Sequence, residues 1–249
     1  MSRLAGRVCV VNGAASEIGQ AVARRFASEG GVVAGVDKAG HSVGEYVVRA
    51  DLVDESQVEA MYEQVVRRFG RLDVIYNNMG LMDRGDHSAL DTSLETWRRV
   101  LDTNLTSIFL ACKHGIRYLR NTAPAGGSVI NAASFLAEIG AATAPMAYAA
   151  AKAGVAQLSR DLGVHLARSG VRVNAVLFGP IDTPDQRAVF DRNPGALDRR
   201  LVHWPMGRFG TLEEAAAAIA FLASDDSGFI TAAALPLDGG ITEAFTVPE

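Results

Sequence analysis

The stretch RVCVVNGAASEIGQAVARRFASEGGVVAGVD, residues 7–37, decides the fold of this chain. It opens with the β-branched run Val8 to Val11, passes through a glycine-containing turn into an amphipathic segment, and ends in a second apolar run, Val32 to Val36. The amphipathic segment has apolar residues at helical spacing, and Gly30-Gly31 ends it. Strand, glycine turn, helix and strand form a βαβ unit, whose two strands run parallel with a right-handed crossover.

The turn between the first strand and the helix predicts a nucleotide site. Such a turn leaves backbone N–H groups free beside the positive end of the helix dipole, where a pyrophosphate can bind. Gly13 and Gly19 provide the tight turn, and Asp37 at the end of the second strand is placed to bind both ribose hydroxyls of an adenosine. The charge of Asp37 would repel a 2′-phosphate, so the sequence favours NAD over NADP. A tight turn with no ligand is the alternative, since a glycine turn alone is weak evidence.

The alternation of strand and helix continues along the chain. Seven strands alternating with helices predict a single α/β domain over residues 1–249, built on one doubly wound parallel sheet. The segment at about 181–205 is rich in Pro, Asp and Arg and interrupts the alternation, so we expect it to be a substrate loop over the site. The further predicted strands are 46–50, 72–76, 128–133, 171–178 and 230–237, and the further predicted helices are 54–69, 94–119, 145–168 and 212–223.

Composition and charge exclude several classes of protein. The 249 residues are 49% hydrophobic, which is enough to bury one large core. The net charge of −4, without a basic tract, argues against nucleic acid as the partner, and no apolar run is long enough to cross a membrane. Cys9 and Cys112 lie in apolar runs and no signal peptide precedes them, so we expect a cytoplasmic protein with neither a disulfide nor a metal site.

A second stretch, SFLAEIGAATAPMAYAAAK from Ser134 to Lys152, carries candidate chemistry. Tyr148 and Lys152 are four residues apart in an alanine-rich run that should be helical, so their side chains share one face. A free tyrosine titrates at about pH 10, and a neighbouring ammonium favours the phenolate and lowers the tyrosine pKa towards working pH. Ser134 follows an apolar run and can present its hydroxyl to a carbonyl oxygen that the tyrosine protonates. A packed Tyr148 with a solvated Lys152 is the alternative.

Five segments in this order resemble the motifs of one family. NGAASEIG at 12–19 resembles its TGxxxGIG turn, Asp51-Leu52 its adenine-contacting pair, NNMG at 77–80 its NNAG, FGPIDTP at 178–184 its PGxxxTP, and PLDGG at 236–240 its VDGG. On these residues the chain is identified as a member of the short-chain dehydrogenase/reductase family over essentially its whole length. The resemblance implies a Rossmann-type sheet of about seven strands flanked by helices, and an NAD(P)-dependent oxidoreductase.

The resemblance also implies roles for individual residues. Asn104, Ser134, Tyr148 and Lys152 fall where the family's catalytic residues fall. Tyr148 would pass a proton to or from the substrate oxygen, and Ser134 would orient that oxygen. Lys152 would lower the tyrosine pKa and hold the nicotinamide ribose, and Asn104 would keep a water that links Lys152 to solvent. By the same resemblance the residues that bind NAD are Gly13, Ser16, Glu17, Ile18, Gly19, Asp37, Asp51, Leu52, Asn78, Gly80, Tyr148, Lys152, Gly179, Pro180, Ile181 and Thr183.

Three residues depart from the family's motifs. Glu17 replaces the middle glycine of the nucleotide turn and brings a carboxyl group near the pyrophosphate, where we expect it to point to solvent. Met79 replaces an alanine and would narrow the cofactor floor or reach the site. Phe178 replaces a proline, which frees one backbone N–H and adds a ring near the nicotinamide.

The spacing between Ser134 and Tyr148 is also one residue longer than in the family. Thr143 is the nearest alternative hydroxyl, and it lies in the loop between the two.

The substrate is expected to be a secondary alcohol or ketone of modest size with an apolar body. The segment 181–205 would cover it, with 135–144 and 81–87 as neighbours, and one arginine could meet an anionic substrate group. The side chains of this region that we expect to pack or to meet the substrate are Met82, Leu136, Glu138, Ile139, Arg187, Phe190, Arg192, His203 and Trp204.

Other functions remain open at this point. Reduction of 3-oxoacyl thioesters is possible because many relatives carry it out. A non-catalytic nucleotide sensor is a second alternative, and a sugar-nucleotide epimerase or dehydratase, which usually needs a larger second lobe, is a third. By the resemblance we also expect a homotetramer that pairs the helices near 94–119 and 146–168.

Overall fold

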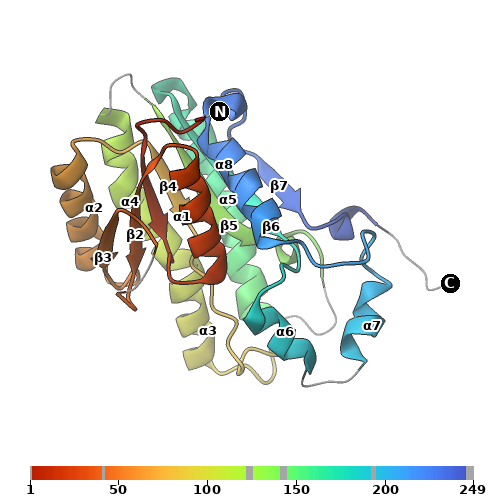
Figure 1. The fold of residues 1–249 in the computed structure, drawn as a ribbon. Helices are drawn as coiled ribbons and strands as arrows, with labels where there is room; N and C mark the ends of the chain where they lie inside the picture. The colour runs from red at the N-terminus through yellow and green to blue at the C-terminus, as the bar shows by residue number, and fades with distance from the viewer. Residues whose placement is uncertain (1, 41–42, 122–125, 141–144, 192–194, 245–249) are drawn as a thin grey trace.

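The structure is a computed structural model that describes residues 2–40, 43–121, 126–140, 145–191 and 195–244. Its centre is one seven-stranded sheet in the order β3-β2-β1-β4-β5-β6-β7, and every neighbouring pair is parallel (Figure 1). The predicted doubly wound sheet is therefore confirmed. The strands are β1 (Val8–Asn12), β2 (Val32–Asp37), β3 (Tyr46–Arg49), β4 (Val74–Asn77), β5 (Gly127–Ser134), β6 (Val171–Phe178) and β7 (Ala234–Leu237).

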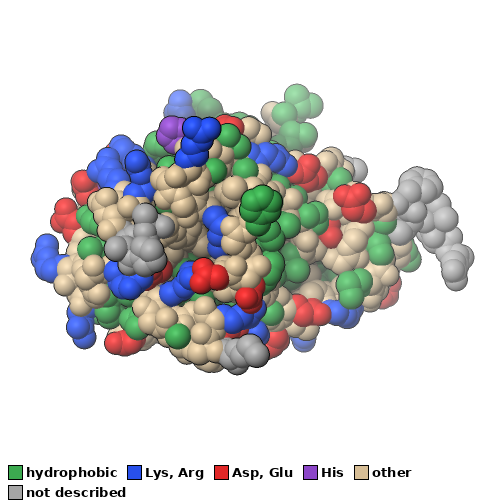
Figure 2. All heavy atoms as spheres, turned by 90° about the horizontal axis from the view of Figure 1, so that it is seen from above, with side chains coloured by type: hydrophobic (Ala, Val, Ile, Leu, Met, Phe, Trp, Pro, Cys, Tyr) green, Lys and Arg blue, Asp and Glu red, His purple; other side chains and the backbone are tan. Residues whose placement is uncertain are grey.

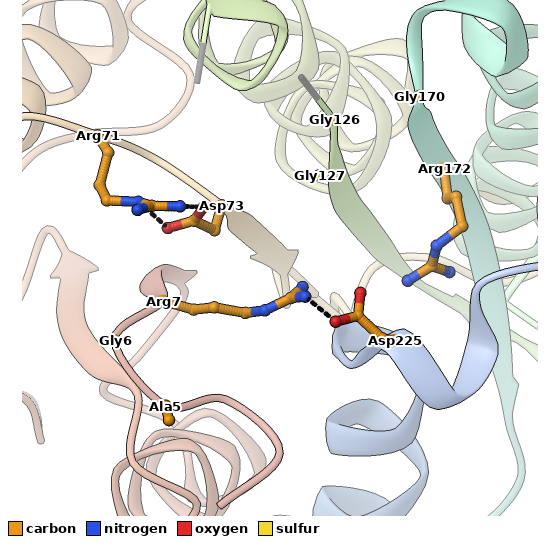
Figure 3. A pocket seen from close by; sticks show the side chains of 10 residues that line it. All are labelled: Ala5, Gly6, Arg7, Arg71, Asp73, Gly126, Gly127, Gly170, Arg172 and Asp225. Carbon is orange, nitrogen blue, oxygen red and sulfur yellow. Dashed lines mark hydrogen bonds and ion pairs between the residues drawn. The ribbon is translucent and has the colours of Figure 1, made fainter. Parts of the chain in front are cut away.

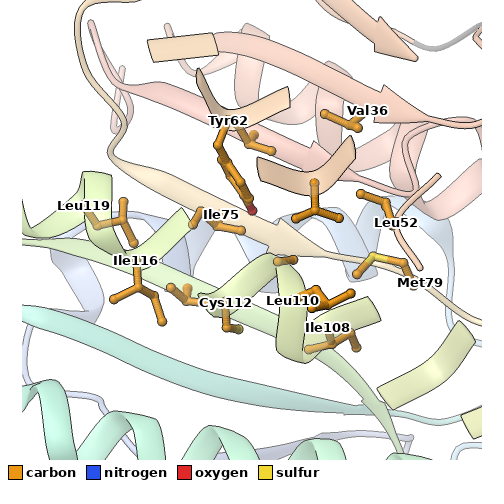
Figure 4. Packing of buried hydrophobic residues seen from close by; sticks show 14 of the residues in the cluster. Val36, Leu52, Tyr62, Ile75, Met79, Ile108, Leu110, Cys112, Ile116 and Leu119 are labelled. Carbon is orange, nitrogen blue, oxygen red and sulfur yellow. The ribbon is translucent and has the colours of Figure 1, made fainter. Parts of the chain in front are cut away.

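Helices cover both faces of the sheet and bury two hydrophobic cores. Helices α1 (Glu17–Ser28) and α8 (Leu212–Ala223) pack on one face. Helices α2 (Glu55–Phe69), α4 (Ser107–Asn121) and α5 (Met146–Leu166) pack on the other. Figure 4 shows part of the core that α2 and α4 cover. This burial of strands on both sides explains why they appear in the sequence as continuous apolar runs.

Three helices begin at residues whose side chains cap the first turn. Ser16 accepts a hydrogen bond from the Gly19 N–H, and Asp54 accepts from the first turn of α2. Thr211 forms a capping box with Glu214 at the start of α8. Each cap satisfies N–H groups that have no partner inside the helix.

The helix predicted at 94–119 is interrupted. It consists of α3 (Leu94–Leu101), a π-helical turn η1 (Asp102–Thr106) and α4. The amphipathic pattern runs through all three, so the sequence pattern could not show the local widening at Asn104.

One other expectation about the elements was wrong. The last strand begins at Ala234 rather than at residue 230, because Ala232 has a left-handed backbone with φ 59° that interrupts the extended conformation. The segment 181–205, expected to interrupt the alternation of strands and helices, contains two short helices, α6 (Pro184–Asp191) and α7 (Ala196–Leu201).

Within the described ranges, no helix is both long enough and apolar enough to span a bilayer. The same ranges contain no cluster of three or more His, Cys, Asp or Glu that could hold a metal ion.

Candidate active site

The Ser134, Tyr148 and Lys152 side chains meet where β5 ends against α5. Ser134 is the last residue of β5, and its hydroxyl acts on the Tyr148 phenol as a hydrogen-bonding neighbour that lowers the tyrosine pKa. Lys152 lies one turn further along α5, with its Nζ 5.6 Å from the centre of the Tyr148 ring. The structure therefore brings together the three groups that the sequence singled out, and the longer spacing does not displace Ser134. Thr143, the alternative hydroxyl, lies outside the described residues.

Lys152 is buried and held in one position. Its side chain is 2% exposed, and Nζ donates to the carbonyl oxygens of Met79 at 2.9 Å and Ala132 at 2.8 Å. Burial without a carboxylate partner disfavours the ammonium and lowers its pKa to about 7. The lysine can therefore gain or lose a proton near neutral pH.

Tyr148 is half-buried, and two effects on its pKa oppose each other. Burial raises the pKa, and the hydrogen bond with Ser134 lowers it, with burial the larger effect. We expected a net lowering by Lys152, and this was wrong for the protein without a bound nucleotide. The reason is that Nζ is directed at two backbone carbonyls rather than at the phenol oxygen.

Asn104 lies in the π-helical turn and is fully buried. Its Oδ1 accepts from the Leu81 N–H at 3.0 Å, and its Nδ2 donates to the carbonyls of Leu81 at 3.0 Å and Val100 at 2.9 Å. A Cβ on Gly80 would lie 3.9 Å from this Oδ1 and 4.0 Å from Lys152 Nζ. Asn104 and Lys152 therefore flank Gly80, and the larger π turn lets Asn104 reach the strand end.

The nucleotide turn has the cramped geometry that a backbone cradle for phosphates requires. Gly13 has φ +74°, and a Cβ there would lie 2.9 Å from the Asn78 carbonyl oxygen. A Cβ on Gly19 would lie 2.3 Å from the Gly13 carbonyl oxygen. Only glycine fits either position. The N–H groups of Glu17 and Ile18 have no partner within α1, because they belong to its first turn, and this arrangement fits a dinucleotide pyrophosphate.

Asn78 fastens this turn to the end of β4. Its Nδ2 donates to Ser16 Oγ at 2.7 Å and to the Gly13 carbonyl oxygen at 3.3 Å. Its Oδ1 accepts from the Tyr76 hydroxyl at 2.8 Å. The role of NNMG in supporting the cofactor side of the sheet thus has a direct geometric basis here.

Asp37 stands at the end of β2, beside the turn. Its Oδ2 accepts from the Ala15 N–H at 3.1 Å and its Oδ1 from the Ala39 N–H at 3.0 Å. These bonds fix the carboxylate, and they leave lone pairs on both oxygens for the two hydroxyls of a ribose.

Asp51 and Leu52, the two residues expected near adenine, differ in polarity and burial. Asp51 Oδ1 accepts from the Val53 N–H at 3.2 Å. Leu52 is 8% exposed and belongs to the same core as Met79, which is 6% exposed (Figure 4). The Met79 side chain therefore fills the core, while its carbonyl oxygen faces Lys152.

The segment 178–183 closes the site beside β6. A Cβ on Gly179 would lie 2.5 Å from Asp238 Cα, so the PLDGG turn packs directly on this glycine. Ile181 pairs with Gly210 in a bridge, and Thr183 Oγ1 accepts from the Gln186 N–H at 3.2 Å at the start of α6. Pro180 connects Gly179 to Ile181 in the chain.

Phe178 is 9% exposed and packs in the core shared with α1 and α8. The bulk that replaces the family's proline is therefore mostly buried.

The substrate segment holds its aromatic residues together and pairs several of its charges. Trp204 meets Phe190 edge-on, with ring centres 6.3 Å apart, and Phe209 at 5.0 Å. Arg187 is paired with Asp182, and Glu138 with Arg160 at 3.0 Å. Arg192, the other arginine considered for an anionic substrate, lies outside the described residues.

Two buried polar features near the site were not predicted from the sequence. Asp86 comes from the irregular segment before α3 and bonds the first turn of α5. Asn12, Asn77 and Asn131 occupy paired positions on β1, β4 and β5 and are joined side chain to side chain at 2.8 Å. The sequence signal for this ladder is weak, because Asn12 and Asn77 directly follow predicted strands whereas Asn131 lies in the middle of one. Asp86 lies in a segment with no periodicity.

A cavity of about 420 Å³ lies at the opposite, amino edge of the sheet (Figure 3). Three arginines and two aspartates line the cavity: Arg7, Arg71, Arg172, Asp73 and Asp225. Four of them form two ion pairs, Arg7–Asp225 and Arg71–Asp73. On the face of the molecule shown in Figure 2, basic and acidic side chains are likewise interspersed. The cavity lies across the sheet from Tyr148 and has no part in the site described above.

Comparison with known proteins agrees with this geometry. The family model described as enoyl-(acyl carrier protein) reductase matches residues 13–242. The chain is 40% identical to cis-4-hydroxycyclohexanecarboxylate dehydrogenase of Sinomonas cyclohexanicum, over 96% of this chain and 97% of that protein. It is 34% identical to the 3-oxoacyl-[acyl-carrier-protein] reductase FabG of Thermotoga maritima, over 96% and 99%.

The structure is also similar to a solved one. The ligand-free aldohexose dehydrogenase of Thermoplasma acidophilum superposes with a TM-score of 0.88 at 31% identity, over 100% of this chain and 99% of that one. The chain therefore belongs to the short-chain dehydrogenase/reductase family.

Proposed function

We propose that this enzyme uses NAD(H) to interconvert a secondary alcohol and a ketone of modest size with an apolar body. The observation that carries the proposal is the arrangement at the carboxyl edge of the sheet. There the Tyr148 phenol lies beside the Ser134 hydroxyl and the buried Lys152, next to a glycine turn shaped for a dinucleotide. Reduction of a ketone by the family's NAD(P) cofactor needs a proton delivered to the substrate oxygen, and oxidation of the alcohol needs a proton removed from it; the Tyr148 phenol could serve both directions.

Each side chain has a defined task in this proposal. A bound nicotinamide would supply or accept the hydride. Tyr148 gives the proton to the ketone oxygen or takes it from the alcohol, and Ser134 donates a hydrogen bond to the same oxygen. Lys152 contacts the nicotinamide ribose and, when protonated, stabilises the phenolate. Asn104 fixes Leu81 through two hydrogen bonds and would keep a water that links Lys152 to solvent.

NAD rather than NADP is proposed because of Asp37. Its carboxylate is fixed by two backbone N–H groups beside the turn, where a 2′-phosphate would have to sit. A second negative charge there would be repelled. Glu17 is half-buried in the first turn of α1.

Organisation, assembly and location complete the proposal. Residues 1–249 form one dinucleotide-binding and catalytic domain, with 181–205 over the substrate. Exposed apolar side chains on α4 and α5, Phe109 at 47% and Val164 at 72%, support a homotetramer that pairs these helices. A monomer in light scattering at micromolar concentration would contradict it. Cys9 and Cys112 are buried free thiols, which supports the cytoplasm as the location.

Nucleotide titration followed by a substrate panel tests the function. We expect NADH to bind at least tenfold more tightly than NADPH by nicotinamide fluorescence, and Asp37→Ala to narrow that ratio. Tyr148→Phe should lower turnover at least a thousandfold while leaving NADH affinity within about twofold, because the phenol oxygen moves the proton and is only one of many groups expected to contact the nucleotide. Retained turnover in Tyr148→Phe would refute the assigned role.

A 3-oxoacyl-thioester reductase is the second candidate, favoured by the Thermotoga maritima relative. The panel therefore includes 3-oxoacyl thioesters beside cyclic and linear ketones. A kcat/KM for thioesters more than tenfold above that for simple ketones would support this second function. Binding of neither nucleotide would instead favour a non-catalytic protein.

A further inference from the structure

Asp86 is a buried carboxylate on the substrate side of the site. It lies in the segment between β4 and α3 and is 5% exposed. Its Oδ1 accepts from the Ala147 N–H and its Oδ2 from the Tyr148 N–H, each at 2.9 Å. Both oxygens thus bind the first turn of α5, more than sixty residues away in the sequence, and one of them binds the backbone of the candidate proton donor itself.

The start of α5 needs such a partner from elsewhere in the chain. The first N–H groups of a helix have no acceptor within it. The residue at the N-cap position is Pro145, whose side chain makes no capping hydrogen bond. Asp86 replaces the missing local cap, and its negative charge also suits the positive end of the helix dipole.

The segment that carries Asp86 is itself fixed to the other side of the site. Asp83 accepts from the Gly85 N–H at 2.8 Å and from Arg99 Nε of α3 at 2.9 Å. Leu81 is held by Asn104. Asp86 therefore joins two parts of the site, the segment around Asn104 and the helix of Tyr148.

We propose that Asp86 is a positioning residue for Tyr148. This inference rests on the proposed function. Two bonds to successive N–H groups fix both the place and the direction of the first turn of α5, and so place the phenol against Ser134. Lys152 is held separately by the carbonyls of Met79 and Ala132, so loss of Asp86 shifts Tyr148 relative to Lys152. A displacement of about 1 Å at a reacting group can cost about 100-fold in rate.

The variants Asp86→Ala and Asp86→Asn in the full-length protein test the proposal. We expect Asp86→Ala to lower kcat about 10- to 100-fold, with KM changed less than threefold and NADH affinity within twofold. Asp86→Asn keeps one acceptor and should lose less, and it carries the test where Asp86→Ala does not fold. Asp91→Asn is the matched control, because Asp91 belongs to the same segment and is exposed, with its carboxylate bonding Ser88 nearby.

A double variant separates positioning of Tyr148 from plain stability. Asp86→Ala should cost no further activity in the Tyr148→Phe background, since residues that act through one group are not additive. A cap with only a structural role would lower the active fraction equally in both backgrounds and leave kcat per nucleotide-binding site unchanged. The proposal would be overturned by an equal loss of active fraction in both backgrounds, or by an unchanged kcat per nucleotide-binding site in Asp86→Ala.

A readout without turnover keeps this inference distinct from the proposed function. Hydrogen exchange of the Ala147 and Tyr148 amides should be at least tenfold faster in Asp86→Ala than in wild type, and unchanged in Asp91→Asn. An absence of turnover on the whole panel by wild type would refute the function. Unchanged exchange in Asp86→Ala would overturn the role of Asp86 whatever the activity.

Discussion

The burial of the single residue Lys152 makes the free energy of unfolding depend on pH. Its pKa is lowered to about 7 in the folded protein, against a normal lysine value of 10.5 in the unfolded chain. Between these two pH values the unfolded state binds more protons, so the free energy of unfolding rises with pH. The contribution is fully present above about pH 10.5 and is lost as the pH falls towards 7.

Lys152→Met removes this dependence. We expect the difference in unfolding free energy between variant and wild type, without nucleotide, to be largest near pH 7 and to shrink by at most about 1.4 kcal/mol per pH unit up to pH 9. The variant should be the more stable protein at pH 7, because the buried ammonium is gone. Urea unfolding at pH 7, 8 and 9 measures this difference, and the buried cysteines and tyrosines cancel because both proteins contain them. A difference that does not change with pH would show that Lys152 is not the titrating group.

The identities of the site residues could be predicted because their types are rare and their spacing is specific. Tyr148 and Lys152 share a helix face, and Ser134 follows a strand, so sequence distance was enough to place them. The hydrogen-bond partners of Lys152 could not be predicted, because Met79 and Ala132 contribute carbonyl oxygens that every residue possesses. The direction of the Tyr148 pKa depends on those same partners and was therefore also missed.

Among the secondary-structure elements, those of the substrate segment 181–205 could not be predicted from sequence patterns. The strands and the long helices were predicted to within a few residues, because their apolar runs are buried on a sheet. Helices α6 and α7 were missed because they are short and polar. Their place is fixed by the contacts of Phe190, Trp204 and Phe209 with one another, which no periodicity reveals.

Trp204→Ala tests whether this aromatic cluster shapes the substrate site. The indole is 9% exposed and makes edge-on contacts with both phenylalanines, each worth about 0.5–1.5 kcal/mol beyond area burial. We expect KM for the ketone to rise at least fivefold while NADH affinity stays within twofold, as measured by steady-state kinetics and fluorescence titration. Phe229→Ala, at a fully exposed ring, is the control and should change neither quantity. An equal loss of NADH affinity in Trp204→Ala would mean that the cluster supports the whole fold rather than the substrate segment.

In the whole molecule, the two edges of the sheet carry different groups of side chains. The carboxyl edge carries the turn, Asp37 and Tyr148, as expected for a parallel sheet, in which ligands bind beyond the carboxyl ends of the strands. The amino edge carries paired arginines and aspartates. There Asp73 is 6% exposed, accepts from the Val8 N–H at 2.8 Å and binds Arg71 through both oxygens. These bonds join the starts of β1 and β4.

Asp73→Asn should therefore lower stability without changing the chemistry. Removing one partner of a buried charge pair typically costs about 3–5 kcal/mol, and the partial exposure of Arg71 reduces the expected loss to about 2 kcal/mol. We expect kcat and NADH affinity at 20 °C to stay within twofold of wild type, because the site lies at the other edge. Asp225→Asn is the matched control at the same cavity. Its side chain is 90% exposed beside Arg7, and such pairs contribute at most about 1 kcal/mol. A tenfold drop in kcat for Asp73→Asn with little loss of stability would show that the two edges are coupled through β4, which ends at the asparagines of the site.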